Sequence, residues 1–174
     1  MAKSGLKLVK VVLRTEQSLA ALTAIKAQVP ELIVGAGTIV NEQILQQAIE
    51  AGADFIVTPA VSSQLLEHLV KCDIPVLPGV SSNADILLTR EFGYTEMKLF
   101  PAALSGGVAY LKAISSIFQD VSFCPTGGVS AENKAEYLAL DNVMAVGGTW
   151  VCQKDWVKNQ DWNAITKACT EALA

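Results

Sequence analysis

The sequence has few charged residues of either sign and no run of basic ones. Its 174 residues include 13 lysines and arginines against 17 aspartates and glutamates, which gives a formal net charge of −4 at pH 7. Nucleic-acid-binding surfaces concentrate positive charge, so this composition argues against a nucleic-acid partner.

Long hydrophobic runs and a secretion signal are absent as well. No apolar run approaches the roughly 18 residues that a membrane-spanning helix needs. The start, Met1–Gly5, has no signal-peptide pattern, and the apolar run after it is interrupted by Lys7 and Lys10. We therefore expect no membrane partner and a cytoplasmic location.

Cysteine and histidine are scarce. The four cysteines form no C-x-x-C pair and show no metal-ligand spacing: Cys72, Cys124, Cys152 and Cys169. We interpret them as small buried hydrophobic residues in a reducing compartment, and we expect no metal site. The single histidine, His68, falls in a predicted helix over Ser62–Lys71 and is interpreted as structural rather than catalytic.

What the sequence does contain is an alternation of apolar, β-branched runs with segments of helical periodicity. The runs predict strands over Leu6–Leu13, Leu32–Val40, Phe55–Ala60, Val76–Val80, Met97–Ala102, Val121–Val129 and Val143–Val151. Helices are predicted between and after them over Glu16–Val29, Asn41–Ala51, Ser62–Lys71, Gly107–Phe118, Ala131–Leu138 and Gln160–Leu173. Helix N-caps are expected at Asn41, Ser62, Ser82 and Ser130.

This alternation indicates right-handed βαβ units and a parallel sheet covered by helices. A doubly wound open sheet and a barrel both fit it. The strand ends favour the barrel, because most runs finish in small or turn-forming residues such as Gly35–Thr38 and Pro125–Gly128, which would build one functional rim. We predict an α/β protein of the (β/α)₈ TIM-barrel type, a single domain over residues 1–174, with seven strands rather than eight.

Lys98 is the leading candidate for chemistry. It lies inside the apolar run Met97–Ala102, and lysine is rarely buried without a reason. Burial disfavours the ammonium form, and a free amine can attack a ketone to form a Schiff base. The alternative is that Lys98 sits at a strand end and reaches water along its stem.

The first predicted strand adds two cations to the same lumen. Side chains at i and i+2 share one face of a strand, so Lys10 and Arg14 point the same way while Val9 and Val11 face the helices. Arg14 could bind a carboxylate through two parallel hydrogen bonds. Alternatively, Arg14 lies beyond the strand and contacts the nearby Glu16.

Two glycine pairs end the last two predicted strands, and their backbone N–H groups could approach a phosphate closely. They are Gly127 and Gly128 after one strand, and Gly147, Gly148 and Thr149 after the other. Barrels often bind phosphate at this place. Thr38 and Thr126 also lie at strand ends, where each hydroxyl could hold a carboxylate or enol oxygen, or simply stabilise a turn.

These motifs together resemble the 2-keto-3-deoxy-6-phosphogluconate (KDPG) aldolase family, which also includes 4-hydroxy-2-oxoglutarate aldolases. The likeness rests on Leu13–Glu16, Val34–Thr38, Met97–Ala102, Phe123–Gly128 and Gly147–Trp150, in this order along the chain. The resemblance implies a class I aldolase, usually a homotrimer, that cleaves a keto-acid phosphate to pyruvate and glyceraldehyde 3-phosphate with no metal or other cofactor.

The resemblance also implies roles for individual residues. Lys98 matches the Schiff-base lysine, and Arg14, Thr38 and Thr126 match contacts to the pyruvyl carboxylate and enamine. The phosphate cradle matches Gly127, Gly128, Gly147, Gly148 and Thr149.

The chain departs from the family in two ways. Lys10 stands where the family carries a glutamate general acid/base, which makes it the second catalytic candidate beside Lys98. An ammonium cannot take the C4 hydroxyl proton, although a neutral Lys10 could, so we expect impaired cleavage. The family begins with one more βα unit, whereas this sequence starts near the end of its helix. We therefore expect open strand edges. Three explanations of the missing unit stay open: a shortened or engineered chain, a misassigned start, or closure of the barrel by a neighbouring subunit.

Two other functions remain open at this point. One is a sugar-phosphate isomerase or epimerase on the same barrel, which needs no buried lysine. The other is a catalytically inactive or engineered barrel that serves as an oligomeric scaffold or ligand binder, an alternative that Lys10 favours.

Overall fold

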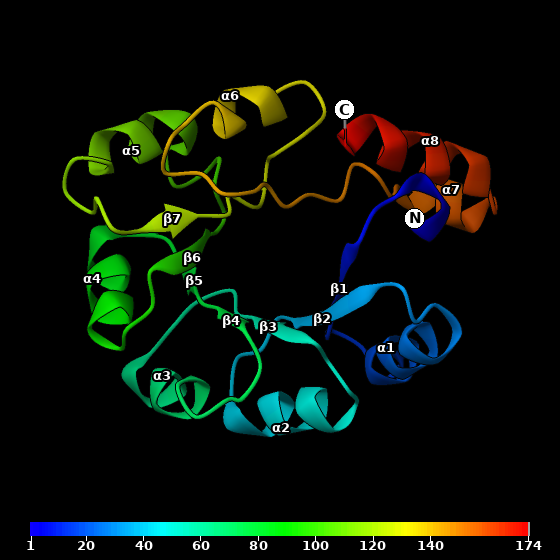
Figure 1. Ribbon diagram of the computed structural model, residues 1–174, viewed down its shortest axis with the longest axis horizontal. Helices are drawn as coiled ribbons and strands as arrows, with labels where there is room; N and C mark the ends of the chain where they lie inside the picture. Colours follow the sequence, from blue (N-terminus) through cyan, green and yellow to red (C-terminus); the bar gives the residue numbers. More distant parts are fainter. Residues whose placement is uncertain (174) are drawn as a thin grey trace.

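The computed structural model describes residues 1–173, in which short parallel strands form an inner ring and helices form an outer one (Figure 1). The strands are β1 (Leu8–Val12), β2 (Ile33–Gly37), β3 (Phe55–Val57), β4 (Val76–Leu77), β5 (Gly79–Val80), β6 (Glu96–Leu99) and β7 (Ser122–Phe123). They pair in the orders β1-β2-β3-β4 and β5-β6-β7, and every pair is parallel. The predicted parallel α/β arrangement is therefore confirmed.

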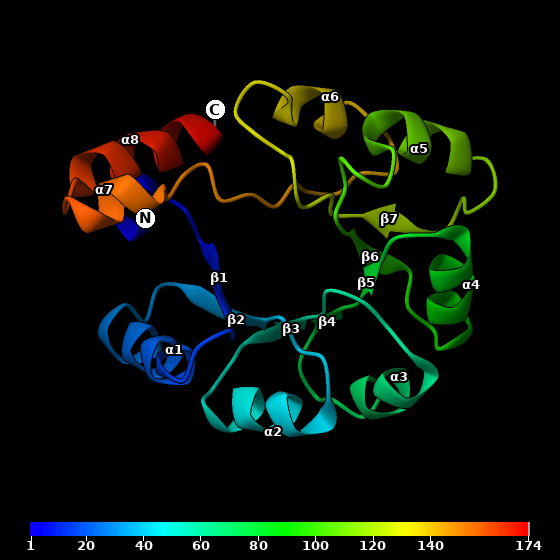
Figure 2. The same cartoon turned by 180° about the vertical axis from the view of Figure 1, so that it is seen from behind.

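The helices surround the strands in both views (Figures 1 and 2). They are the 3₁₀ helix η1 (Ala2–Ser4), α1 (Gln17–Gln28), α2 (Glu42–Glu50), α3 (Ser63–Leu69), α4 (Asn83–Glu91), α5 (Gly107–Ile114), α6 (Lys134–Leu138), α7 (Lys154–Lys158) and α8 (Trp162–Leu173). No helix among residues 1–173 combines the length and the apolar content needed to cross a bilayer.

Polar caps start three of the helices as expected. The side chains of Asn41, Ser62 and Ser82 accept hydrogen bonds from backbone N–H groups in the first turns of α2, α3 and α4. The expectation for Ser130 is wrong. Helix α6 begins only at Lys134, and the Asn133 side chain instead accepts the Ser130 backbone N–H at 2.8 Å, which stabilises a turn before the helix.

The apolar core lies between the strands and the helices, in two clusters. One surrounds β6 and contains Met97, Leu99, Leu111 and Phe123, and the other surrounds β2 and β3. Met97 and Leu99 are fully buried in the first cluster, as strand parity predicts for residues that face the helices. The intervening residue, Lys98, therefore points to the other side, into the lumen.

The seven observed strands are not the seven expected ones. The run Val76–Val80 is divided into β4 and β5 at Pro78, which has no N–H to continue the ladder. The predicted strand Val143–Val151 is wrong: only isolated bridges join this segment to its neighbour, Phe123 to Val143 and Thr126 to Gly147. Glycines weaken a strand, and within residues 1–173 no other strand pairs with this segment to support it.

The ring is open between this segment and β1. Strand β1 is the end of its sheet and pairs only with β2 among the described residues. Figures 1 and 2 show no strand between β1 and the segment that leads to α7. The expected open strand edge is therefore present.

Candidate active site

Lys98 lies in the middle of β6 and is only 4% exposed. Its Nζ donates a hydrogen bond of 3.4 Å to the carbonyl oxygen of Thr58 and lies 4.0 Å from the centre of the Phe100 ring. Burial, followed by the positive charge of Lys10, lowers the pKa of Lys98 to about 8. At neutral pH about a tenth of such a side chain is a free amine, the form that attacks a carbonyl carbon.

Lys10 enters the same lumen from β1. It pairs in register with Gly35, and its Cδ lies 2.7 Å from where a Cβ on Gly37 would stand, so its stem runs toward the carboxyl ends of the strands. Burial lowers the pKa of Lys10, with Cys124 opposing and Arg14 adding to the effect. Gly37 therefore provides the space that brings this second amine into the site.

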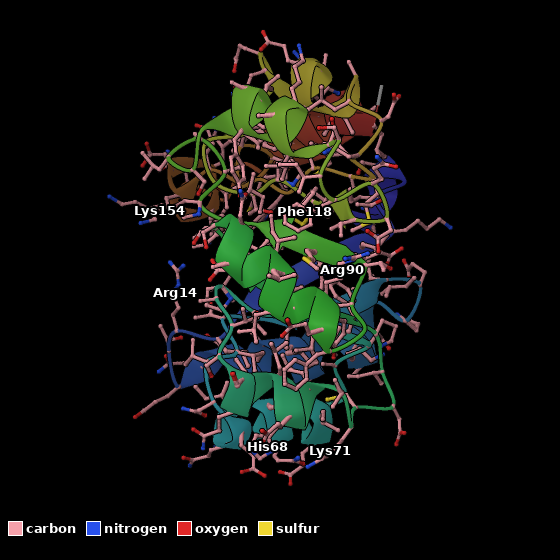
Figure 3. The ribbon with its side chains drawn as sticks, turned by 90° about the vertical axis from the view of Figure 1, so that its left-hand side faces the viewer. Arg14, His68, Lys71, Arg90, Phe118 and Lys154 are labelled. Atoms are coloured by element: carbon pink, nitrogen blue, oxygen red, sulfur yellow. The ribbon has the colours of Figure 1, made fainter. Side chains whose placement is uncertain are left out.

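Arg14 lies two residues beyond β1 and is exposed at the carboxyl-terminal end of the strand. Figure 3 shows it projecting from the same side of the molecule as Lys154. Its charge reaches the lumen, because it contributes to the lowered pKa of both Lys10 and Lys98. The alternative contact with Glu16 is not among the ion pairs of residues 1–173.

The two threonines lie at strand ends, as predicted. Thr38 follows β2 with a φ of 68°, a left-handed conformation that is uncommon for residues other than glycine and that recurs at functional sites. The Thr126 Oγ1 donates to the carbonyl of Cys124 at 3.4 Å. A Cβ on residue 147 would lie 2.6 Å from this hydroxyl oxygen, so a glycine at this position avoids a steric clash with Thr126.

The two glycine pairs differ in what requires them. Gly127 and Gly128 have φ values of 92° and 80°, a turn that other residues adopt only with strain. Gly148 has no such conformation; the Trp150 ring packs where its Cβ would stand. The Gly127–Gly128 turn is therefore the stronger candidate for an anion contact through backbone N–H groups.

The sequence pattern did not predict that two further residues, Thr58 and Cys124, belong to the surroundings of Lys98. Thr58 is fully buried, and its Oγ1 accepts the Gly79 N–H at 2.8 Å while its carbonyl accepts Lys98. The sequence predicts the cysteines to be small buried hydrophobic residues, but only Cys169 is buried, and Cys124 is half-buried. Burial raises the pKa of its thiol, and a hydrogen bond with Thr126 and the two lysines act in the opposite direction. Their positions at strand ends were the only available signal.

His68 lies outside the site, as interpreted. It belongs to the outer helix α3, where its Nδ1 is 3.3 Å from Glu42 Oε1, and Figure 3 places it with Lys71 at the edge of the molecule. The site thus gathers Lys98, Lys10 and Arg14 within one electrostatic environment, with Cys124 beside them.

The fold and this arrangement agree with comparisons to known proteins. The sequence pattern of the KDPG and KHG aldolase family matches residues 1–168. This chain belongs to that family. It is 44% identical to the 2-dehydro-3-deoxy-phosphogluconate aldolase of Pseudomonas aeruginosa over 173 residues, which cover 99% of this chain and 79% of the relative. It is 42% identical to the KHG/KDPG aldolase of Escherichia coli K12, covering 99% of this chain and 81% of that protein.

Solved structures of the family superpose closely on this chain. The KDPG aldolase of Legionella pneumophila, with pyruvate captured as a covalent carbinolamine intermediate, has a TM-score of 0.94 at 38% identity and covers 97% of this chain and 82% of its own. That of Zymomonas mobilis ZM4, with 3-phosphoglycerate, has a TM-score of 0.91 at 39% identity, covering 98% and 80%. The fold is therefore that of the TIM-barrel aldolases, and the family resemblance drawn from the motifs is confirmed.

Proposed function

We propose that this protein is a class I aldolase that cleaves 2-keto-3-deoxy-6-phosphogluconate to pyruvate and glyceraldehyde 3-phosphate and that also accepts 4-hydroxy-2-oxoglutarate. The observation that carries the proposal is Lys98, whose amine is buried in the lumen with a pKa of about 8. The Legionella relative, with pyruvate held as a covalent carbinolamine, supports this chemistry.

In the proposed reaction, the neutral amine of Lys98 attacks the C2 ketone, and loss of water leaves an iminium ion. Water takes the proton of the C4 hydroxyl, the C3–C4 bond breaks with release of glyceraldehyde 3-phosphate, and the electron pair of that bond moves into the iminium to form an enamine. The enamine takes a proton at C3, and water then hydrolyses the imine to release pyruvate and restore the amine.

The remaining site residues hold the substrate in this proposal. Arg14, Thr38 and Thr126 bind the pyruvyl carboxylate and the enamine, which their positions at the strand ends support. The phosphate contacts are assigned to Gly127, Gly128, Gly147, Gly148 and Thr149. Among these, the positive φ values of Gly127 and Gly128 give the strongest support.

Lys10 makes this chain an impaired aldolase in our proposal. A protonated lysine cannot accept the C4 hydroxyl proton, whereas the glutamate that the family resemblance places here could. Loss of general acid/base assistance typically costs about 10²–10⁴ in rate. Schiff-base formation does not need that carboxylate, so we expect pyruvate to bond to Lys98 even where cleavage is slow.

The second candidate function is a catalytically inactive barrel that binds ligands or serves as a scaffold, which the same Lys10 favours. Borohydride reduction in the presence of pyruvate separates the two functions. We expect a reduced pyruvyl adduct that peptide mapping assigns to Lys98, and none in a Lys98→Met variant. An unmodified Lys98 in the folded protein would contradict the aldolase function.

The proposed assembly is a homotrimer, as the family resemblance implies, and the proposed location is the cytoplasm. The four cysteines lie far apart in the sequence and show no paired spacing, which favours a reducing compartment. Native mass spectrometry tests the assembly, and a purely monomeric species at micromolar concentration would contradict it.

A further inference from the structure

The lumen contains one more cation than the proposed reaction uses. Resting on the aldolase function above, we propose that Lys10 is a specificity-determining residue that binds a second carboxylate of the substrate. The chain then prefers short dicarboxylic 2-oxo acids, of which 4-hydroxy-2-oxoglutarate is the cleavable member, over 2-oxo acids of the same length with an uncharged end.

The position of Lys10 carries the first part of the argument. The register partner of Lys10 on β2 is Gly35, and Gly37 lies two residues further along that strand. The Cδ and Cε atoms of Lys10 lie 2.7 Å and 3.2 Å from the position that a Cβ on Gly37 would take. The stem is therefore laid along β2 toward the carboxyl ends of the strands, where Thr38 and Arg14 lie. An ammonium held in this direction faces a ligand that enters from the rim.

Charge carries the second part. The charge of Arg14 lowers the pKa of Lys10, and the charges of Lys10 and Arg14 lower the pKa of Lys98. None of these three cations takes part in the ion pairs found among residues 1–173. The acidic group that acts on Lys10 and Lys98 is the thiol of Cys124, whose own pKa is raised by burial. An anionic ligand that pairs with a half-buried cation stabilises it, because the cation has no carboxylate partner within the described part of the chain.

The third part of the argument compares the number of carboxylates on the substrate with the number of cations in the site. A 2-oxo dicarboxylate joined to Lys98 through C2 presents one carboxylate at C1 and another at the far end of a five-carbon chain. Arg14 accounts for the first in the proposed function, and Lys10 is the spare cation for the second. An ammonium at position 10 attracts that second carboxylate.

The test compares two probes that differ only in the terminal group. 2-Oxoglutarate carries a terminal carboxylate, 2-oxopentanoate carries a methyl, and neither has the C4 hydroxyl that cleavage requires. Each is incubated with the full chain and borohydride, and the concentration that gives half-maximal adduct on Lys98 is measured by peptide mapping. We expect 2-oxoglutarate to be effective at a concentration about tenfold lower or more, because a charge-assisted hydrogen bond typically contributes about that factor.

Three variants sharpen the test. Lys10→Met should bring the two concentrations within about twofold of each other, whereas Lys10→Arg should retain the preference, because a bidentate cation still binds a carboxylate. Lys71→Met, which removes the same charge from the outer surface, should leave the ratio as it is in the unmodified chain. Any change in the reactivity of Lys98 itself affects both probes and cancels in the ratio.

The outcomes separate this proposal from the one it rests on. Failure of pyruvate to modify Lys98 would overturn the aldolase function and the role of Lys10 together. Efficient pyruvate adduct formation with no preference for 2-oxoglutarate in the unmodified chain would overturn only the role of Lys10, whether or not the variants fold. A preference that survives Lys10→Met would assign the second carboxylate to another group and would equally overturn it.

Discussion

The two lumen lysines lie in regions of the barrel that differ in how they are closed. Around Lys98, strand β6 is hydrogen-bonded on both edges: the Lys98 N–H donates to Pro78 at 2.8 Å, and the Cys124 N–H donates to Met97 at 2.8 Å. Around Lys10, strand β1 pairs only with β2 within the described residues 1–173, and all residues of β1 are exposed or half-buried.

This difference shows that the same residue type acquires its chemistry from its surroundings. Burial is the largest cause of the lowered pKa of both lysines, but Lys98 is only 4% exposed whereas Lys10 is half-buried. In β1, one edge of the strand is open, and Lys10 keeps a larger share of contact with water. The lysine proposed to bond covalently to the substrate is thus the more deeply buried of the two.

The largest expected effect comes from removing the amine of the closed region. Lys98→Met should lower cleavage of 2-keto-3-deoxy-6-phosphogluconate by about 10³-fold or more, as loss of a covalent nucleophile typically does. A coupled assay for pyruvate measures it, with circular dichroism as a control for folding. Retention of more than a tenth of the activity would show that Lys98 is not the nucleophile, and the proposed difference between the two lysines would fail.

The packing of the two regions can be compared through stability. Leu99→Ala, at a fully buried position in β6, should lower the free energy of unfolding by about 2–5 kcal/mol. Val11→Ala, at a half-buried position in β1, should cost only about 1 kcal/mol. Urea denaturation followed by fluorescence measures both. Equal losses would show that the open edge of β1 does not weaken its region.

Lys10→Glu converts the open region into the arrangement that the family resemblance implies. A carboxylate can accept the C4 hydroxyl proton, so cleavage of 2-keto-3-deoxy-6-phosphogluconate should rise at least about tenfold. The rate is measured at saturating substrate, with Lys10→Gln as the variant that removes the charge without adding a base. If the rate does not rise, the impairment has a source other than Lys10.

The smallest expected effect is electrostatic. Adduct formation on Lys98 with pyruvate should increase with pH through a midpoint near 8, because the reactive form is the neutral amine. Lys10→Met removes a positive neighbour, which raises the pKa of Lys98 and moves the midpoint upward. The movement should be less than about one pH unit, because the larger cause, burial, remains. A midpoint that moves downward would contradict the shared lumen.

Much of this molecule could be predicted from local pattern. The alternation of apolar runs and helical segments gave the parallel α/β architecture, and parity placed Lys98 opposite Met97 and Leu99. Side-chain capping at Asn41, Ser62 and Ser82 depends only on residues a few positions away, so it was predictable. The motifs in order also identified the family.

Other features depend on contacts between segments far apart in the chain. The run Val143–Val151 is apolar enough for a strand, yet a strand forms only where neighbouring backbones complete its hydrogen bonds, and here the ring stays open. Three further features likewise arise from packing: the hydrogen bond between Lys98 and Thr58, the effect of both lysines on Cys124, and the course of the Lys10 side chain over Gly37.

The sequence by itself therefore determined which residues could carry chemistry and which face of each strand they occupy, because both follow from residue type and from a period of two. Only the tertiary structure decided how strongly each is shielded from water and which charges face one another. Desolvation and Coulomb interactions depend on distances across the barrel, and these distances exist only once the strands are assembled.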